Sequence, residues 1–204
     1  MSDLTGLRTS LGWLIGSAID AATWTPALLD EALRNGLRTY SERGPISETS
    51  FLVSTSGSQQ ELSSIAQLYS VVGLAWPWSA NADFERLAVR WRLIDQQSVY
   101  LLDGLQPLAG DLLRVRYRKL YTIQELDGAA STTVPPDHER IVLLASVVWL
   151  VDIRLRQLAE NPAVPKEAVP TLTALREEWQ AELNERFYAL PGLLPNPVWR
   201  DIGL

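Results

Sequence analysis

The chain has 204 residues, and its 47% hydrophobic and 21% charged residues are typical of a globular protein rather than of a disordered chain. A formal net charge of −6 argues against a protein whose whole surface binds nucleic acid, although a local basic patch is compatible with it. The absence of cysteine excludes disulfides, thiolate metal sites and thiol nucleophiles, and it favours a reducing compartment.

Apolar spacing predicts two helices at the start of the chain, together covering residues 4–43. The first, over Leu4–Ile19, has its apolar residues three and four positions apart, as on one helical face. The second begins at Thr25-Pro26, a capping hydroxyl followed by proline at the first helical position, and ends at Gly44-Pro45. Leu11–Ile19 lacks the charged start and the cleavage site of a signal peptide, so we expect no export signal.

Alternation of apolar and polar residues predicts a small antiparallel sheet over residues 48–121. The clearest strand is Leu87–Leu93, and we expect further strands at Ser98–Leu102 and Leu113–Arg118. Weaker strand patterns occur at Glu48–Ser54 and Leu68–Ala75. Because the clear strands alternate, each should have one buried and one wet face.

A helical period returns after residue 128 and predicts two long helices over residues 135–190. The first begins near Pro135-Pro136 and includes Ile141–Val151, a run that is apolar nearly all round and therefore typical of a central core helix. This run is far shorter than the ~18 residues that a membrane span needs, so we expect no membrane segment. The second begins near Pro170, and the two should pack as an antiparallel pair.

These elements predict an α+β fold, a helical bundle with a small antiparallel sheet inserted in the middle. We expect one domain over residues 1–190, followed by a different kind of segment at 191–204. In that segment Pro191, Pro195 and Pro197 prevent a continuing helix, although many of its residues are apolar.

The order of these elements and several short sequence motifs resemble those of the head-to-tail adaptor, or connector, proteins of tailed bacteriophages. The matching residues of the first half are Asp20, Trp24-Thr25, Leu28 to Leu33 and Tyr40, with Pro107 to Asp111 leading into Val115 to Tyr117. Those of the second half are Leu126 to Ala129 and Thr132 to Pro135, which precede the apolar helix. Their order, spread from about Leu4 to Leu190, makes the resemblance specific, because each piece alone is ordinary capping or turn chemistry.

The resemblance implies a structural virion protein of the neck, made in the host cytoplasm. Such adaptors form a ring under the portal, usually twelvefold, which extends the DNA channel and offers a surface to the tail or a stopper protein. The resemblance implies no catalysis, no cofactor and no sequence-specific DNA binding. Alternatives that remain open are another neck or tail-completion protein and a non-catalytic double-stranded DNA-binding module.

The residues show no constellation for catalysis or metal binding. The one histidine, His138, lies in the first turn of a predicted helix without a second histidine, so we expect a solvated surface side chain. The neighbouring Glu177 and Glu178 point in different directions on a helix and fit a wet face. The sequence therefore predicts no enzyme, no cofactor and no metal.

Arginines and tryptophans are the candidate interaction residues of the middle of the chain. The arginines are Arg90, Arg92, Arg114, Arg116 and Arg118, and they would share one basic face if their strands were neighbours. Such a face would contact another subunit or DNA phosphates, or would simply be solvated. Trp76 and Trp78 flank Pro77 and could form an exposed aromatic platform, whereas we expect Trp13, Trp91, Trp149 and Trp179 to lie in the core.

Residues 191–204 are the predicted docking segment for the portal or a neighbouring subunit. The residues expected to make these contacts are Val198, Trp199, Arg200, Ile202 and Leu204. They include a large aromatic and three aliphatic side chains, a composition typical of interface contacts.

Overall fold

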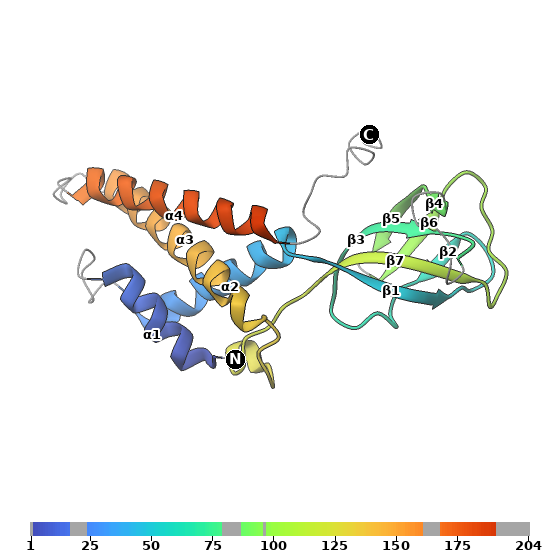
Figure 1. The fold of residues 1–204 in the computed structure, drawn as a ribbon, viewed down its shortest axis with the longest axis horizontal. Helices are drawn as coiled ribbons and strands as arrows, with labels where there is room; N and C mark the ends of the chain where they lie inside the picture. The colour runs from blue at the N-terminus through green and yellow to red at the C-terminus, as the bar shows by residue number, and fades with distance from the viewer. Residues whose placement is uncertain (1, 17–23, 79–86, 96, 161–167, 191–204) are drawn as a thin grey trace. The chain divides into compact units, whose positions relative to one another are not determined.

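The structure is a computed structural model that describes residues 2–16, 24–78, 87–95, 97–160 and 168–190, without the side chains of 47–50. It has the predicted α+β fold, with helices from both ends of the chain and strands from the middle (Figure 1). The chain divides into two compact units, one formed by residues 1–44 and 121–204 and the other by residues 45–120. We call them the helical unit and the β unit.

The helical unit contains α1 (Leu4–Ile15), α2 (Pro26–Arg43), α3 (Glu139–Glu160) and α4 (Val169–Ala189). The predicted start of α2 is confirmed, because the Thr25 hydroxyl accepts a hydrogen bond from the Leu28 amide at 3.3 Å and Pro26 follows it. The first helix is shorter than predicted. It ends at Ile15, where Gly16 takes a left-handed φ of 59° that glycine adopts without strain.

Helix α3 is the centre of the helical unit, as its apolar run predicted. It packs against α1, α2 and α4, and it is buried on nearly every side from Ile141 to Val151. The α3–α4 pair is antiparallel, since Arg140 near the start of α3 pairs with Glu182, whereas Asp152 further along pairs with Arg176. Figure 1 shows these two helices side by side.

Helices α2 and α3 approach each other most closely at Gly36. A Cβ atom on Gly36 would lie 2.2 Å from the Ser146 hydroxyl and 2.5 Å from the Val142 carbonyl oxygen. Ser146 is fully buried, and its hydroxyl donates to that same carbonyl at 2.8 Å. The lack of a side chain at Gly36 therefore permits this helix contact.

The described residues of the β unit form seven strands in two antiparallel sheets rather than one. The strands are β1 (Ile46–Val53), β2 (Gln59–Glu61), β3 (Leu68–Ala75), β4 (Ala88–Val89), β5 (Trp91–Asp95), β6 (Ser98–Leu101) and β7 (Leu112–Lys119). The first sheet has the order β1-β7-β3-β4, and the second has the order β2-β6-β5. The weaker strand predictions at β1 and β3 are confirmed, whereas β2 was not predicted because three residues show no period.

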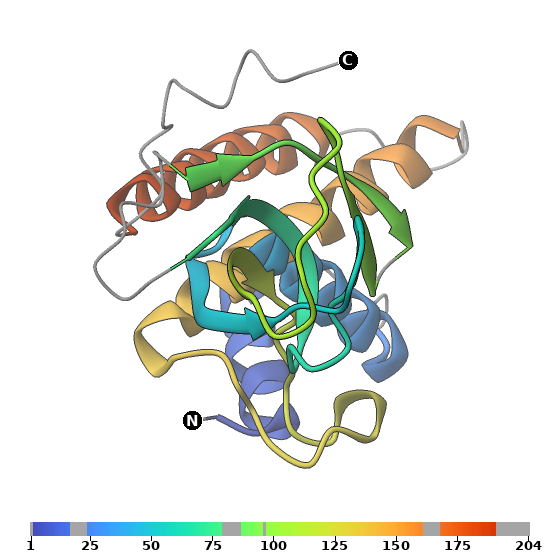
Figure 2. The same cartoon turned by 90° about the vertical axis from the view of Figure 1, so that its right-hand side faces the viewer.

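The predicted continuous strand over Leu87–Leu93 is wrong, because the chain changes sheets at Arg90. Before that residue β4 pairs with β3, and after it β5 pairs with β6. The Arg90 carbonyl between them accepts a hydrogen bond from the Leu102 amide at 2.9 Å. In Figure 2, which faces the β unit, the green chain of β4 and β5 can be followed through this bend.

Both sheets contribute to one apolar core in the β unit. Its fully buried members include Leu74 of β3, Val99 and Leu101 of β6, and Val115 of β7. The alternation predicted for β7 is confirmed, since Leu113, Val115 and Tyr117 are buried between partly exposed arginines.

The prediction for the core tryptophans is confirmed for Trp179, which is buried, and wrong for Trp13, which is 83% exposed. Trp91 and Trp149 are half-buried against the cores of their units. The buried stripe of α1 includes Leu11. Trp13 lies two residues further on, about 200° around the helix, and therefore points away from that stripe. Within the described ranges, no helix combines the length and apolar character of a membrane span.

Candidate functional site

The five arginines do not form one basic face, because Arg92 and the arginines of β7 belong to different sheets and Arg90 lies between β4 and β5. Arg92 lies on β5, whereas the arginines of β7 lie in the four-stranded sheet, and β5 and β7 are not neighbours. Arg90 is paired with Asp103, with a distance of 2.8 Å from its Nε to Oδ2, and this pairing lowers the pKa of the Asp103 carboxyl. The guanidinium of Arg92 lies 5.0 Å from the centre of the Tyr100 ring, a cation–π contact.

The three arginines of β7 share the outer face of their sheet, as the alternation predicted. They are half-buried rather than fully solvated. Arg114 lies 5.5 Å from the ring centre of Trp78, and burial lowers the pKa of Arg118. The wet face expected for this strand is therefore partly covered.

Trp76 and Trp78 do not form an exposed platform. Trp76 is half-buried against the β-unit core, and its indole N–H donates to the Asp111 carboxylate at 3.2 Å. Trp78 is also half-buried and lies beside Arg114. An interface role for either residue stays a prediction. The predicted docking residues Val198, Trp199, Arg200, Ile202 and Leu204 lie outside the described residues.

His138 is not the solvated side chain that the sequence predicted. Its side chain is 16% exposed, and its Nδ1 forms a hydrogen bond with the hydroxyl of Tyr40, which is fully buried. The Tyr40 ring also packs against Tyr121 with 4.6 Å between ring centres, and burial raises its pKa. The contact joins α2 to the short 3-10 turn that precedes α3, so these residues stabilise the helical unit.

The described residues contain no group of three or more histidine, cysteine or acidic side chains that could bind a metal. Glu177 and Glu178 are exposed on α4, in agreement with the predicted wet face.

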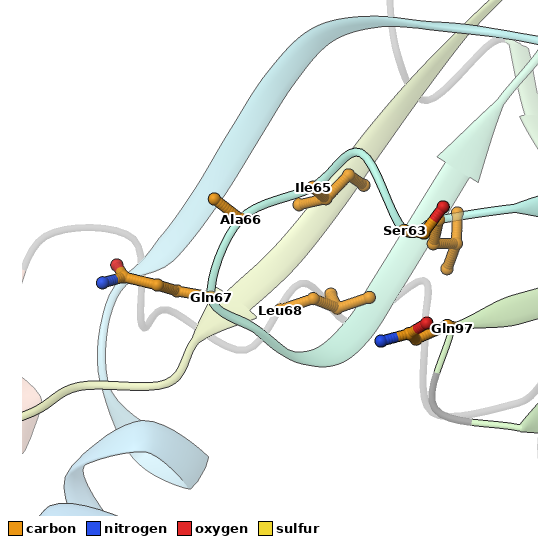
Figure 3. A pocket seen from close by; sticks show the side chains of 7 residues that line it. Ser63, Ile65, Ala66, Gln67, Leu68 and Gln97 are labelled. Atoms are coloured by element: carbon orange, nitrogen blue, oxygen red, sulfur yellow. The ribbon is translucent and has the colours of Figure 1, made fainter. Parts of the chain in front are cut away.

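A shallow pocket of about 300 Å³ lies on the β unit between the end of β2, the start of β3 and the β5–β6 turn (Figure 3). Its apolar wall consists of Leu62, Ile65 and Leu68, and polar side chains are contributed by Ser63, Gln67 and Gln97. The backbone closes one side, where the Leu62 amide donates to the Gln97 carbonyl at 2.7 Å. This lining has no charged group, so it suits an apolar or amide-bearing segment rather than an ion.

Two aromatic side chains stand out on the helical unit. Trp13 on α1 and Tyr188 near the end of α4 are 83% and 82% exposed. The described neighbours of Trp13 on the helix surface, Thr9, Ser10 and Gly16, are small and uncharged, and Thr9 and Gly16 are exposed. A partner could therefore approach the indole ring closely without displacing a long side chain.

The β unit exposes apolar side chains on two strands at the edges of its sheets. On β1 these are Phe51 and Val53, which are 56% and 58% exposed, and on β5 they are Leu93 and Ile94, at 53% and 47%. Phe51 lies in a bulge, since the pairing passes from Thr49 opposite Val115 to Leu52 opposite Leu113. Apolar side chains beside unpaired strand edges are suited to interaction with another chain.

The sequence reasoning missed these exposed residues for two reasons. The small residues around Trp13 were a usable signal, because a helix face of threonine and glycine has little to bury. The edge positions of β1 and β5 left no such signal, since the sheet order depends on pairing between distant segments.

No protein-family model matches the chain, and no curated protein sequence matches it.

Proposed function

We propose that the protein is a structural, non-catalytic adaptor of a tailed-phage neck, which assembles as a ring under the portal and provides the attachment surface of the tail. The order of elements supports the proposal, because two short helices, an inserted β region and two long helices are the order on which the resemblance rests. In this role the portal and the tail or stopper protein are the partners, and DNA passes through the channel.

The exposure of Trp13 is the observation that most supports an assembly. A tryptophan that is 83% exposed and bordered by small residues is unfavourable in water, and it is typical of the few anchors that dominate interface energy. Its distance from the buried stripe of α1 means that folding of the single chain does not require it. A subunit or portal contact would bury it.

The alternative of a DNA-binding module rests on the shared arginine face, which the sheet order divides. Arg90 is neutralised by Asp103, and Arg92 lies on Tyr100. No specific observation favours DNA binding over an assembly role.

Light scattering after size exclusion tests the proposal, with the chain alone and mixed with the portal from the same genome. We expect a species of many times 22.8 kDa, alone or with the portal. Trp13→Ala should reduce that assembly, whereas Thr5→Ala, at another exposed position of α1, should not. A chain that stays monomeric and ignores the portal at every concentration would contradict the proposal.

A further inference from the structure

Strand β5 has one edge that no described strand pairs with. In the three-stranded sheet it pairs with β6 through Trp91–Leu101, Arg92–Tyr100, Leu93–Val99 and Asp95–Ser98, with a register shift between Leu93 and Asp95. These pairs place Trp91 and Leu93 on the face of the core, because their partners Leu101 and Val99 are fully buried. Leu93 is nevertheless 53% exposed. The core is therefore incompletely covered along the unpaired side of β5, which we call the β5 edge.

The sequence contains one segment whose pattern matches this edge. Residues Val198–Leu204 follow the last proline of the chain, so each of them has a backbone N–H that can join a strand ladder. Val198, Arg200, Ile202 and Leu204 alternate with Trp199, Asp201 and Gly203. This period of two puts the three aliphatic residues on one side of an extended strand.

We propose that residues 198–204 of a second copy of this chain add to the β5 edge as an antiparallel strand. In the register that pairs Leu204 with Trp91, Ile202 lies opposite Leu93 and covers the exposed side of the core. The same register brings Arg200 opposite Asp95. A strand added in this way contributes main-chain hydrogen bonds for affinity and side-chain matches for specificity.

Charge complementarity selects this register and direction. Asp95 is exposed at the end of β5, and hydrogen bonds from the Ser98 side chain and the Gln97 amide lower its pKa. Its carboxylate is therefore charged where Arg200 arrives. On the outer face, Asp201 lies diagonal to Arg92, which is the second opposite-charge neighbour in the same register. A shift by one residue would place Arg200 opposite Ile94 and turn Ile202 away from the core.

This inference rests on the proposed ring assembly, and it names one contact between subunits. Each copy gives a segment and receives one, so the contact joins two different surfaces and repeats from subunit to subunit. Such heterologous contacts close into rings when the rotation between subunits allows it.

The first experiment compares the full chain with a chain that stops at Asn196. Light scattering gives the mass of each, and hydrogen exchange gives the protection of residues 91–95. We expect the shortened chain to lose the oligomer and to exchange faster at β5. A fluorescein-labelled peptide of residues 196–204 should bind the shortened chain one to one and restore that protection.

Charge reversal tests the register. Arg200→Asp and Asp95→Arg should each weaken the assembly about fivefold, and the double variant should recover it, because the opposite-charge pair is restored. Glu61→Arg is the matched control, since Glu61 is exposed on β2 at the other edge of the same sheet. Equal effects of Glu61→Arg and Asp95→Arg would contradict the assignment to β5.

The outcomes separate this inference from the proposed function. A ring that persists without residues 197–204, with unchanged exchange at β5, overturns the inference and leaves the adaptor role standing. If the full chain is monomeric and its own residues 198–204 protect β5, the proposal that a second copy supplies the segment is overturned. A chain that forms no ring with or without the portal, and whose peptide does not bind, overturns both.

Discussion

The two units of the molecule satisfy the hydrogen-bonding groups of their backbones in different ways. In the helical unit each helix makes its own backbone hydrogen bonds, and α3 is surrounded by apolar side chains from α1, α2 and α4. In the β unit the described strands are short and must bond to one another, and the edges of β1 and β5 face no described strand. Both units bury a core, but the β unit keeps backbone groups and apolar side chains available for another chain.

The two units also differ in the polar groups that they bury. The buried polar side chains described in the helical unit are hydroxyl groups, those of Ser41, Thr132 and Ser146. The β unit buries the amide of Gln60, whose Nε2 donates to the carbonyls of Thr55 and Gly57, and whose Oε1 accepts from the Thr55 amide. A side-chain amide thus replaces strand pairing next to β2.

The largest expected effects come from opening a cavity in each core. Leu144→Ala in α3 and Leu101→Ala in β6 each remove a fully buried side chain and should cost about 3 kcal/mol. The two cores share no residue, so each change should accelerate hydrogen exchange mainly in its own unit. Equal acceleration of exchange in both units by either variant would show that the units unfold as one, and the difference drawn between them would then be wrong.

Overpacking the α2–α3 contact should cause the next largest loss of stability, and it should do so in the helical unit. Gly36→Ala places a Cβ within 2.5 Å of two atoms of α3, and it should cost about 2 kcal/mol despite the better helix propensity of alanine. Gly12→Ala is the matched control, since a Cβ there meets nothing within 4 Å. Urea unfolding should show the control unchanged or slightly stabilised, and a loss of stability in both would refute the assignment to the contact.

Removal of the buried amide tests the β unit in the same way. Gln60→Leu leaves the Thr55 amide and the Gly57 carbonyl without their partner and should cost about 2 kcal/mol. Gln59→Leu changes an exposed neighbour on the same strand and should shift stability by less than about 0.5 kcal/mol. Thermal unfolding of the two variants measures the difference, which vanishes if the amide network contributes nothing.

The smallest expected effect concerns an ion pair at the surface of the helical unit. Arg140 and then Arg186 lower the pKa of Glu182, so this carboxylate stabilises the fold above its unfolded pKa of about 4.3 and the effect is lost as pH falls through the lower folded pKa. Glu182→Gln should therefore cost up to about 1 kcal/mol at pH 7 and nothing at about pH 2. Urea midpoints at the two pH values measure it, with the exposed Glu178→Gln as the flat control.

The helical unit followed from sequence in most respects. Capping at Thr25-Pro26, the apolar run of α3 and the antiparallel α3–α4 pair were all predictable, because helix signals lie within a few residues of one another. The prediction for Trp13 was wrong because this residue was assigned to the core although it lies off the apolar stripe of α1. His138 was misplaced because its partner, Tyr40, lies 98 residues away.

The β unit was predictable only strand by strand. Alternation located β3, β6 and β7, but it did not show that the chain changes sheets at Arg90 or that β5 lies at an edge. Those features divided the five arginines and exposed Leu93 and Ile94, and so they changed which residues are candidates for interaction.

The sequence by itself determined the fold class, the order of the helices and of the main strands, and the core-facing residues of α3 and β7, because these depend on local periods and caps. Only the tertiary structure decided which strands are neighbours, which edges stay unpaired and which aromatic residues are exposed. Strand pairing depends on contacts between distant segments, and a period of two is compatible with many sheet orders. The candidate surfaces of this protein arise from that second kind of information.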